Sequence, residues 1–159
     1  MNSTPSKINS IQIDGASKTQ FCVNGDPDNV IELNTSDLNV VMRYKKALPQ
    51  IQKLGEEALQ IKADLKFDDI DEDGFDEFFE KLNECDAKMK AIVNEVFGSD
   101  VAEKCAAGGT MFDPVNGELR AVVIMTSLMA AYNEGLEKEV DKSVKSGKKH
   151  TAKYTAKKK

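Results

Sequence analysis

The sequence predicts an α+β protein that is mainly α, with a small N-terminal antiparallel β-hairpin or meander, a three-helix-type bundle and a disordered basic tail. Apolar residues recur every three or four positions over much of residues 38–140, which is the period of amphipathic helices. Short segments of alternating polarity, separated by turn residues, precede them. With 159 residues, 40% of them hydrophobic, the chain has the size of one domain.

Composition and charge divide the chain into three parts. Residues 1–10 are polar and are expected to be disordered, residues 11–141 form the single helical domain, and residues 142–159 form the tail. The tail holds eight of the 22 basic residues and no acidic residue, which leaves 14 basic against 27 acidic residues elsewhere. An acidic body therefore carries a basic tail. Such a body repels phosphate backbones, so nucleic acid is not expected as the main partner.

The N-terminal part predicts two or three short strands. Apolar and polar residues alternate at residues 11–13 and 21–23, and a further apolar segment covers residues 30–33. Residues 15–17 and 24–29 are rich in turn-forming residues and separate these segments. So small a sheet needs a helix packed on one face to be stable.

The first predicted helix follows at once. Thr35 or Ser36 is a candidate N-cap, with Asp37 in the first turn. Pro49 predicts a kink or a break near Ala47, because proline has no backbone N–H to donate. The predicted apolar face consists of Leu38, Val41, Tyr44, Leu48, Ile51, Leu54, Ala58, Ile61 and Leu65.

The second predicted helix has the most regular pattern in the chain and ends at Gly98, a typical C-cap residue. Two of its residues, Leu82 and Ile92, are expected to be buried against the first and third helices. The apolar seam consists of Phe75, Phe78, Leu82, Cys85, Met89, Ile92 and Val96, flanked by Phe79, Val93 and Phe97.

The remaining pattern predicts a short helix over residues 99–105 and a third long helix. Asp113 and Pro114 have the residue types of an N-cap and a first helical position. The apolar period stops near residue 141. The residues predicted to face inward are Leu119, Val122, Val123, Leu128, Met129, Tyr132, Leu136 and Val140.

One segment matches a calcium-binding loop. In residues 69–80, acidic residues stand at loop positions 1, 3 and 5, Gly74 at position 6 and a glutamate at position 12, as in an EF-hand. The candidate metal ligands are Asp69, Asp71, Asp73 and Glu80. The alternative is that these acids stabilise the N-terminus of the second helix, which the apolar seam from Phe75 onward favours.

Few residues suit catalysis. The single histidine, His150, stands in the lysine-rich tail, and the three cysteines show no C-x-x-C spacing. We therefore expect no enzyme activity, no cofactor and free thiols. The N-terminus lacks the pattern of a secretory signal, and no apolar run approaches the roughly 20 residues of a membrane span, so a cytoplasmic location without membrane contact is expected.

Three segments resemble a family of small proteins encoded beside the tail genes of long-tailed phages and prophages of Gram-positive bacteria, the tail assembly chaperone-like group. Residues 38–48 resemble its "x-R-Y-x-x-A-L" helix start, residues 93–104 its "hydrophobic-Phe-Gly" turn and short helix, and residues 149–159 its basic end. The resemblance implies a non-enzymatic phage tail assembly chaperone that binds the tape measure protein during virion assembly in the host cytoplasm, and the tail tube protein is a second candidate partner.

This function predicts particular contact residues and leaves alternatives open. Methionines can line adaptable grooves for partner helices, and a lysine tail can attract acidic partners. The candidate partner-binding residues are Met125, Met129, Lys148, Lys149, Lys153, Lys157, Lys158 and Lys159. A homo-oligomer is possible. The alternatives are a single-site calcium-binding module and a structural tail or connector component of the virion.

Overall fold

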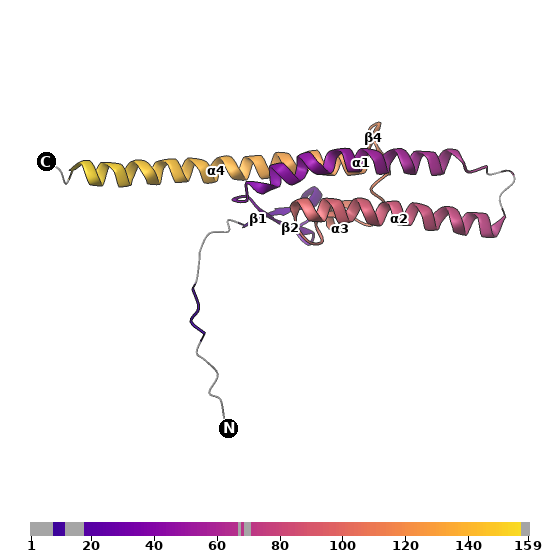
Figure 1. Ribbon diagram of the computed structural model, residues 1–159, viewed down its shortest axis with the longest axis horizontal. Coiled ribbons are helices and arrows are strands. Elements are labelled where there is room, and N and C mark those ends of the chain that lie inside the picture. The colour runs from indigo at the N-terminus through magenta and orange to yellow at the C-terminus, as the bar shows by residue number, and fades with distance from the viewer. Residues whose placement is uncertain (1–7, 12–17, 67, 69–70, 157–159) are drawn as a thin grey trace, which may run out of the picture.

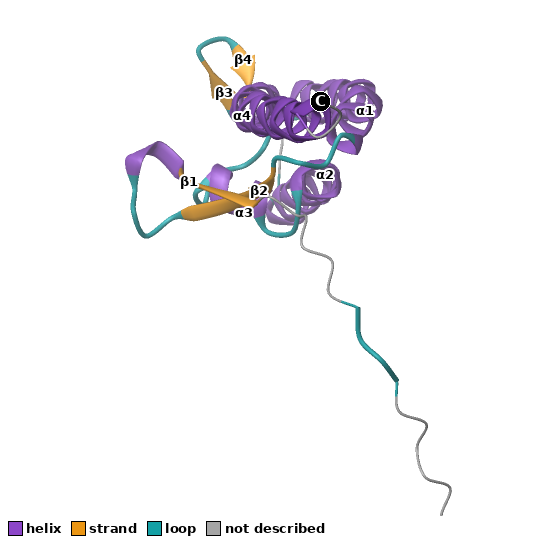
Figure 2. Ribbon diagram, turned by 90° about the vertical axis from the view of Figure 1, so that its left-hand side faces the viewer, coloured by secondary structure: helices purple, strands orange, loops and turns teal. Residues whose placement is uncertain are grey.

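A computed structural model describes residues 8–11, 18–66, 68 and 71–156, with side chains to residue 147. The chain is mostly helical, 67% in all, and begins with a two-stranded antiparallel hairpin (Figure 1), which confirms the predicted fold class. Viewed along the helices, α1 (Asn39–Ala63) and α4 (Arg120–Ala156) lie side by side above α2 (Glu72–Phe97), and the three form a bundle (Figure 2).

The N-terminal hairpin pairs β1 (Lys18–Cys22) with β2 (Val30–Asn34), and a 3-10 turn, η1 (Val23–Gly25), follows β1. Alternate residues of β2, Ile31 and Leu33, are buried, so one face of the sheet packs on the core. The third strand expected near residues 11–13 is not seen at Ile11, which is exposed and outside any strand. Residues 12–17 lie outside the described part of the chain.

α1 begins later than predicted. Neither Thr35 nor Ser36 caps it: Thr35 is fully buried, and Ser36 donates a hydrogen bond to the side chain of Asn34. Asp37 accepts the N–H of Asn39, the first helical residue, through its carboxylate. The buried face starts at Val40, so Leu38 and Val41, both predicted to face inward, are exposed.

Of the kink or break expected near Ala47, the break does not occur, since α1 continues through Pro49 to Ala63. Proline deprives the carbonyl four residues earlier of its partner. The packing of neighbouring residues compensates for this loss, since Ala47 and Ile51 on either side of Pro49 are both buried. The helix therefore continues across the proline with packed residues on both sides of it.

α2 confirms the predicted seam in its second half only. Cys85, Met89, Val93 and Val96 are buried, and Gly98 follows the helix as predicted. Leu82 and Ile92, expected to be buried, are only partly buried. The first half of α2 extends with α1 beyond the other elements (Figure 1), so fewer residues are available to cover it.

The segment between α2 and α4 differs most from the prediction. The short helix α3 (Val101–Ala106) is present as predicted. Asp113 and Pro114, however, do not start a long helix. Pro114–Val115 (β3) and Glu118–Leu119 (β4) form a second small antiparallel hairpin, and α4 starts only at Arg120. The two residues between these strands, Asn116 and Gly117, both have positive φ, which a tight two-residue hairpin turn requires.

Hydrogen bonds join the bundle at the start of α1. The Tyr132 hydroxyl of α4 donates to the backbone carbonyl of Asp37 at 2.5 Å. Arg43 donates to the Asp37 carboxylate at 2.7 Å and to the Val96 carbonyl at the end of α2 at 3.2 Å. The Arg43 hydrogen bond lowers the pKa of Asp37. All three long helices thus meet at this point.

α4 is longer than predicted and protrudes from the rest of the molecule (Figure 1). It continues through residues 142–156, for which the sequence predicts a disordered tail, while residues 157–159 lie outside the described part. All described side chains from Val140 to Gly147 are exposed, so the prediction that Val140 faces inward is wrong and the packed part of α4 ends before the apolar period does. Lysine and alanine favour helix, and a packed helix needs only to propagate into such a segment.

A candidate partner-binding groove

An apolar groove lies where α1, α2 and the β3–β4 hairpin meet. Its volume is 420 Å³. The three elements contribute mostly hydrophobic side chains to its walls, and a few charged residues stand among them. The lining residues are Ala58, Leu59 and Lys62 of α1, Phe78 and Leu82 of α2, Phe112 and Asp113 of the preceding loop, and Pro114, Gly117, Glu118 and Leu119 of the hairpin.

The spacing of residues along each element explains how the groove forms. Phe78 and Leu82 are four residues apart and share one face of α2. Leu119 lies across the backbone of α1 at Gly55, where a Cβ atom would be 2.4 Å from the Leu119 Cδ1 atom. The missing side chain of Gly55 therefore lets the hairpin approach α1 closely enough to form one wall of the groove.

Polar contacts fix the loop that precedes the hairpin. The backbone N–H and the hydroxyl of Thr110 both donate to the Asp113 carboxylate, and the Arg120 guanidinium lies 3.6 Å from it. The hydrogen bond from the Thr110 hydroxyl is the main cause of the lowered pKa of Asp113. The Met111 N–H donates to Asp86 of α2 at 2.7 Å. These bonds hold the rim of the groove against α2, so the groove is largely preformed.

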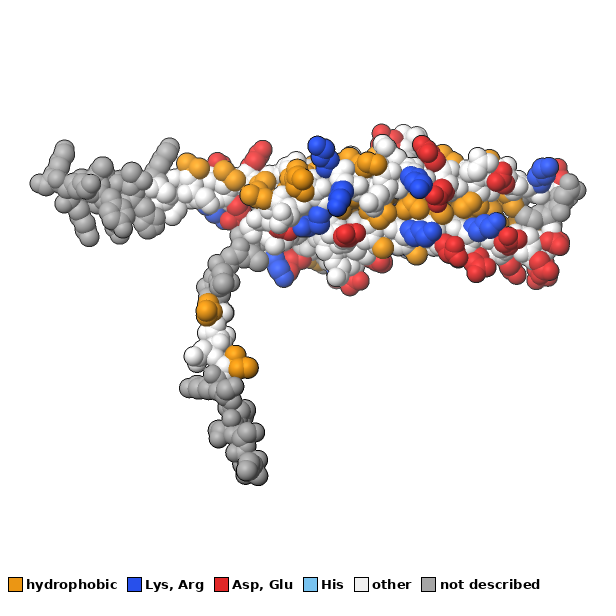
Figure 3. Space-filling view, viewed as in Figure 1, with side chains coloured by type: hydrophobic (Ala, Val, Ile, Leu, Met, Phe, Trp, Pro, Cys, Tyr) orange, Lys and Arg blue, Asp and Glu red, His pale blue; other side chains and the backbone are white. Residues whose placement is uncertain are grey.

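Two large hydrophobic side chains are left uncovered in this region. Leu59 is 60% exposed and Phe79 55% exposed. Phe79 contacts Phe78 edge-to-face, with ring centroids 5.4 Å apart. Hydrophobic side chains form a band between α1 and α2, and acidic side chains gather toward the end of the molecule where α1 ends and α2 begins (Figure 3). An exposed apolar surface with a charged rim is typical of a protein-binding site.

The groove stands in the most acidic part of the chain. Residues 56–86 hold 13 of the 27 acidic residues and only three lysines, a formal charge of −10. The exposed acidic residues of α2 include Asp76, Glu77, Glu80 and Glu84. Charge complementarity therefore favours a ligand with an apolar face and basic flanks.

A larger hollow of 560 Å³ lies between the N-terminal hairpin, α3 and α4, but it is a weaker candidate. Polar and apolar groups contribute to its lining in similar amounts. Its one thiol, Cys105, has a raised pKa because of burial, so the thiol stays protonated at neutral pH and is a weak nucleophile.

The described residues of the predicted calcium loop lie at the start of α2 and within it. Asp71 caps α2, its carboxylate accepting the N–H of Gly74 at 2.8 Å, and both Asp73 and Glu80 lie within the helix. Two residues seven positions apart on a helix are separated by about 10 Å along its axis, too far to share one ion. Asp69 lies outside the described residues. Within the described part of the chain, no three His, Cys, Asp or Glu side chains are grouped to bind a metal ion.

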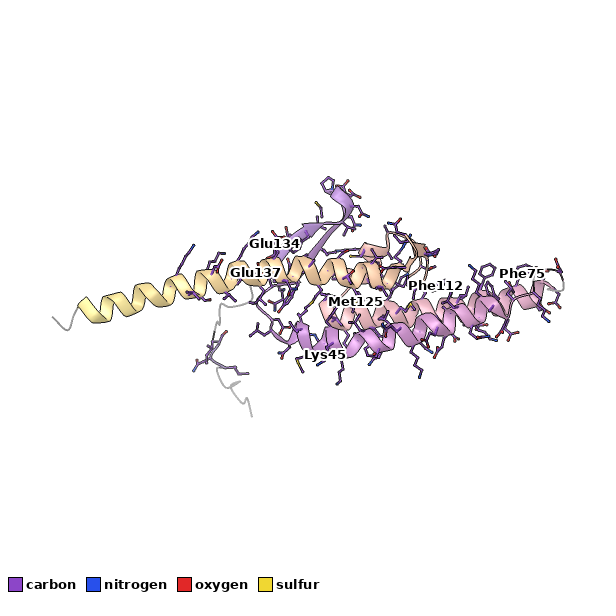
Figure 4. All side chains as sticks on the ribbon, turned by 90° about the horizontal axis from the view of Figure 1, so that it is seen from above. Lys45, Phe75, Phe112, Met125, Glu134 and Glu137 are labelled. Atoms are coloured by element: carbon purple, nitrogen blue, oxygen red, sulfur yellow. The ribbon has the colours of Figure 1, made fainter. Side chains whose placement is uncertain are left out.

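The predicted partner-binding residues are not brought together. Met125 is fully buried and lies on the side of α4 that faces the other helices (Figure 4), so a partner cannot reach it in this structure. Met129 is partly buried against the core. The positions Lys148, Lys149 and Lys153 lie on α4 beyond the residues whose side chains are described, and Lys157–Lys159 lie outside the described part.

Leu59, Phe112 and Glu118 line the groove although no sequence pattern predicted them as contact residues. Leu59 stands beside the predicted apolar stripe of α1, not on it, and an apolar residue off the stripe is one signal of an exposed contact surface. The other available signal is the Asn116–Gly117 dipeptide, which is typical of a two-residue hairpin turn and places Glu118 and Leu119 opposite β3.

Comparison with protein-family models, with curated proteins and with solved structures gave no match to this chain. Among the described residues, no helix combines the length and the apolar character that crossing a membrane requires. The class of the protein is therefore defined by its architecture alone, a mainly helical bundle with an open apolar groove.

Proposed function

We propose that this protein is a non-enzymatic phage tail assembly chaperone that acts in the host cytoplasm and binds helical segments of the tape measure protein. The observation that carries the proposal is the apolar groove between α1, α2 and the β3–β4 hairpin. A groove of this kind accepts the apolar face of an amphipathic helix. The resemblance of three sequence segments to the chaperone-like group supports the same function.

The proposed role of the groove is to cover apolar surface of the tape measure protein. A tape measure protein has long apolar helices, which aggregate unless they are covered before the tail tube assembles around them. Leu59, Leu82 and Leu119 would cover one stripe of such a helix. The acidic side chains of α2 would attract basic residues beside that stripe and raise the association rate, in a manner that depends on ionic strength.

Co-purification with the tape measure protein encoded near the same gene tests the proposal. Leu59→Asp places a charge in the groove at an exposed position, so the fold should survive while binding weakens about tenfold or more. Met42→Asp is the matched control, because Met42 is 67% exposed on the same helix but does not line the groove. Equal binding by both variants would contradict the proposed role of the groove.

Analysis of purified virions separates the chaperone from a structural component of the tail. A chaperone leaves the tape measure protein as the tail tube assembles, so mass spectrometry should detect the tail proteins of the finished particle without this chain. A fixed number of copies per virion would instead identify it as a tail or connector component.

A further inference from the structure

The chain carries opposite charges at its two ends. The acidic region of residues 56–86 includes the end of α1 and the first half of α2, whereas the helical residues 142–156 contain five lysines and no acidic residue. Figure 1 shows that the end of α1 and the start of α2 lie at one end of the long axis, and the protruding end of α4 at the other. Attraction between copies therefore favours a head-to-tail arrangement.

The protruding part of α4 carries an apolar stripe. Leu136, Val140 and Val144 follow at intervals of four and so share one face of the helix. Leu136 packs partly against the core, but Val140 is 49% exposed and Val144 is 50% exposed. Lys142 and Lys145, which are exposed as well, stand beside this stripe. The segment thus has the features that the groove requires of a ligand, an apolar face and basic flanks.

This segment cannot reach the groove of its own chain. Leu119 lines the groove, and α4 leads away from it from Arg120 onward. At 1.5 Å per residue, Val144 lies about 37 Å along the helix from Leu119. A continuous helix cannot fold back over this distance, so any groove that it occupies belongs to another molecule.

We propose that the protruding part of α4 of one copy docks in the groove of a second copy. Val140 and Val144 contact Leu59, Leu82 and Leu119, and Lys142 and Lys145 lie near the acidic residues of α2. Pairing of two protruding helices with each other is disfavoured, because it would bring two lysine-rich segments together. A pair of copies joined in this way leaves one groove and one protruding helix free, so further copies can add and the interface produces chains or closed rings. The inference does not depend on the proposed function.

The test uses two full-length variants with complementary defects. The helix variant, Val140→Asp with Val144→Asp, keeps an intact groove, and the groove variant, Leu59→Lys with Glu118→Lys, keeps an intact helix. Light scattering during size-exclusion chromatography should show oligomers of the wild-type chain and monomers of each variant alone. An equimolar mixture should give a dimer and nothing larger, because only one compatible interface remains in it.

Three controls keep the outcome decisive. Circular dichroism of both variants should match the wild-type chain, and Met42→Asp should assemble as the wild-type chain does. Raising the salt concentration from about 50 to about 500 mM should weaken assembly about tenfold or more, because the interface joins opposite charges. A wild-type monomer at all concentrations, a mixture without dimer, or assembly that is lost on nuclease treatment would overturn the proposal.

Discussion

Gly135 is the position at which the packing of α4 makes the sharpest prediction. It is a buried residue of α4 that lies against Thr35, which is itself fully buried after β2. A Cβ atom at residue 135 would lie 2.3 Å from the Thr35 Cγ2 atom and 2.8 Å from its Cβ atom. Carbon atoms in contact are normally about 3.5–4.0 Å apart. We therefore expect Gly135→Ala to be destabilising.

Two opposing effects determine the size of this change. Alanine is better than glycine inside a helix by about 1 kcal/mol. Overpacking of a core costs about 1–3 kcal/mol. The upper end of this range applies at Gly135, because one of the obstructing atoms is the Thr35 Cβ atom, which no side-chain rotation can move. The expected net loss in the free energy of unfolding is about 2 kcal/mol.

Urea unfolding followed by circular dichroism measures this loss. Gly147→Ala is the matched control, since a Cβ atom there would have no atom within 4 Å and only the gain in helix propensity remains. In a Thr35→Ser background the nearest methyl group is gone, so Gly135→Ala should cost less than it does with threonine at residue 35. A Gly135→Ala variant as stable as the wild-type chain would refute this reasoning.

Three further predictions concern single side chains. Met89→Ala should lower the free energy of unfolding by about 2–5 kcal/mol, because Met89 is fully buried. Leu82→Ala should lower it by only about 1 kcal/mol, because Leu82 lines the groove and is partly exposed. Urea unfolding of the two variants measures both values. Tyr132→Phe should cost about 1–3 kcal/mol, since it leaves the backbone carbonyl of Asp37 without the Tyr132 hydroxyl. The Arg43 hydrogen bond lowers the pKa of Asp37 in the folded chain. The ionised carboxylate therefore stabilises the fold fully above its unfolded pKa of about 3.9, and this stabilisation is lost as the pH falls through the folded pKa. Thermal melting between about pH 2 and 7 should therefore show a smaller acid destabilisation for Asp37→Asn than for the wild-type chain.

The sequence predicts a helix best where the regular spacing of its apolar residues is enough to identify it. The spacing of Cys85, Met89 and Val96 identifies α2, and Gly98 identifies its end. The prediction is wrong where two local signals compete. Asp113–Pro114 favours a helix start and Asn116–Gly117 a hairpin turn, and the structure follows the turn, because only the hairpin places Leu119 against Gly55 of α1.

The groove could not be predicted from a pattern in one segment. Its walls come from residues 58–62, 78–82 and 112–119, and they become neighbours only through the packing of α1, α2 and the second hairpin. Periodicity shows which face of a helix is apolar, but it does not show how far that face is covered. Leu82 and Met89 occupy the same seam of α2, and only the second of them has neighbours enough to be buried.

The protruding end of α4 is helical although its described side chains are exposed. None of the described side chains from residue 141 to 147 is packed, and the like charges of Lys142 and Lys145, three residues apart, oppose the helix. Helix persists because it extends from the packed residues before it and needs no new nucleus. An acidic groove on a second copy would neutralise these lysines and cover Val140 and Val144, so docking and helix formation would strengthen each other. Helicity of the wild-type chain should then rise with protein concentration, and helicity of the Val140→Asp, Val144→Asp variant should not.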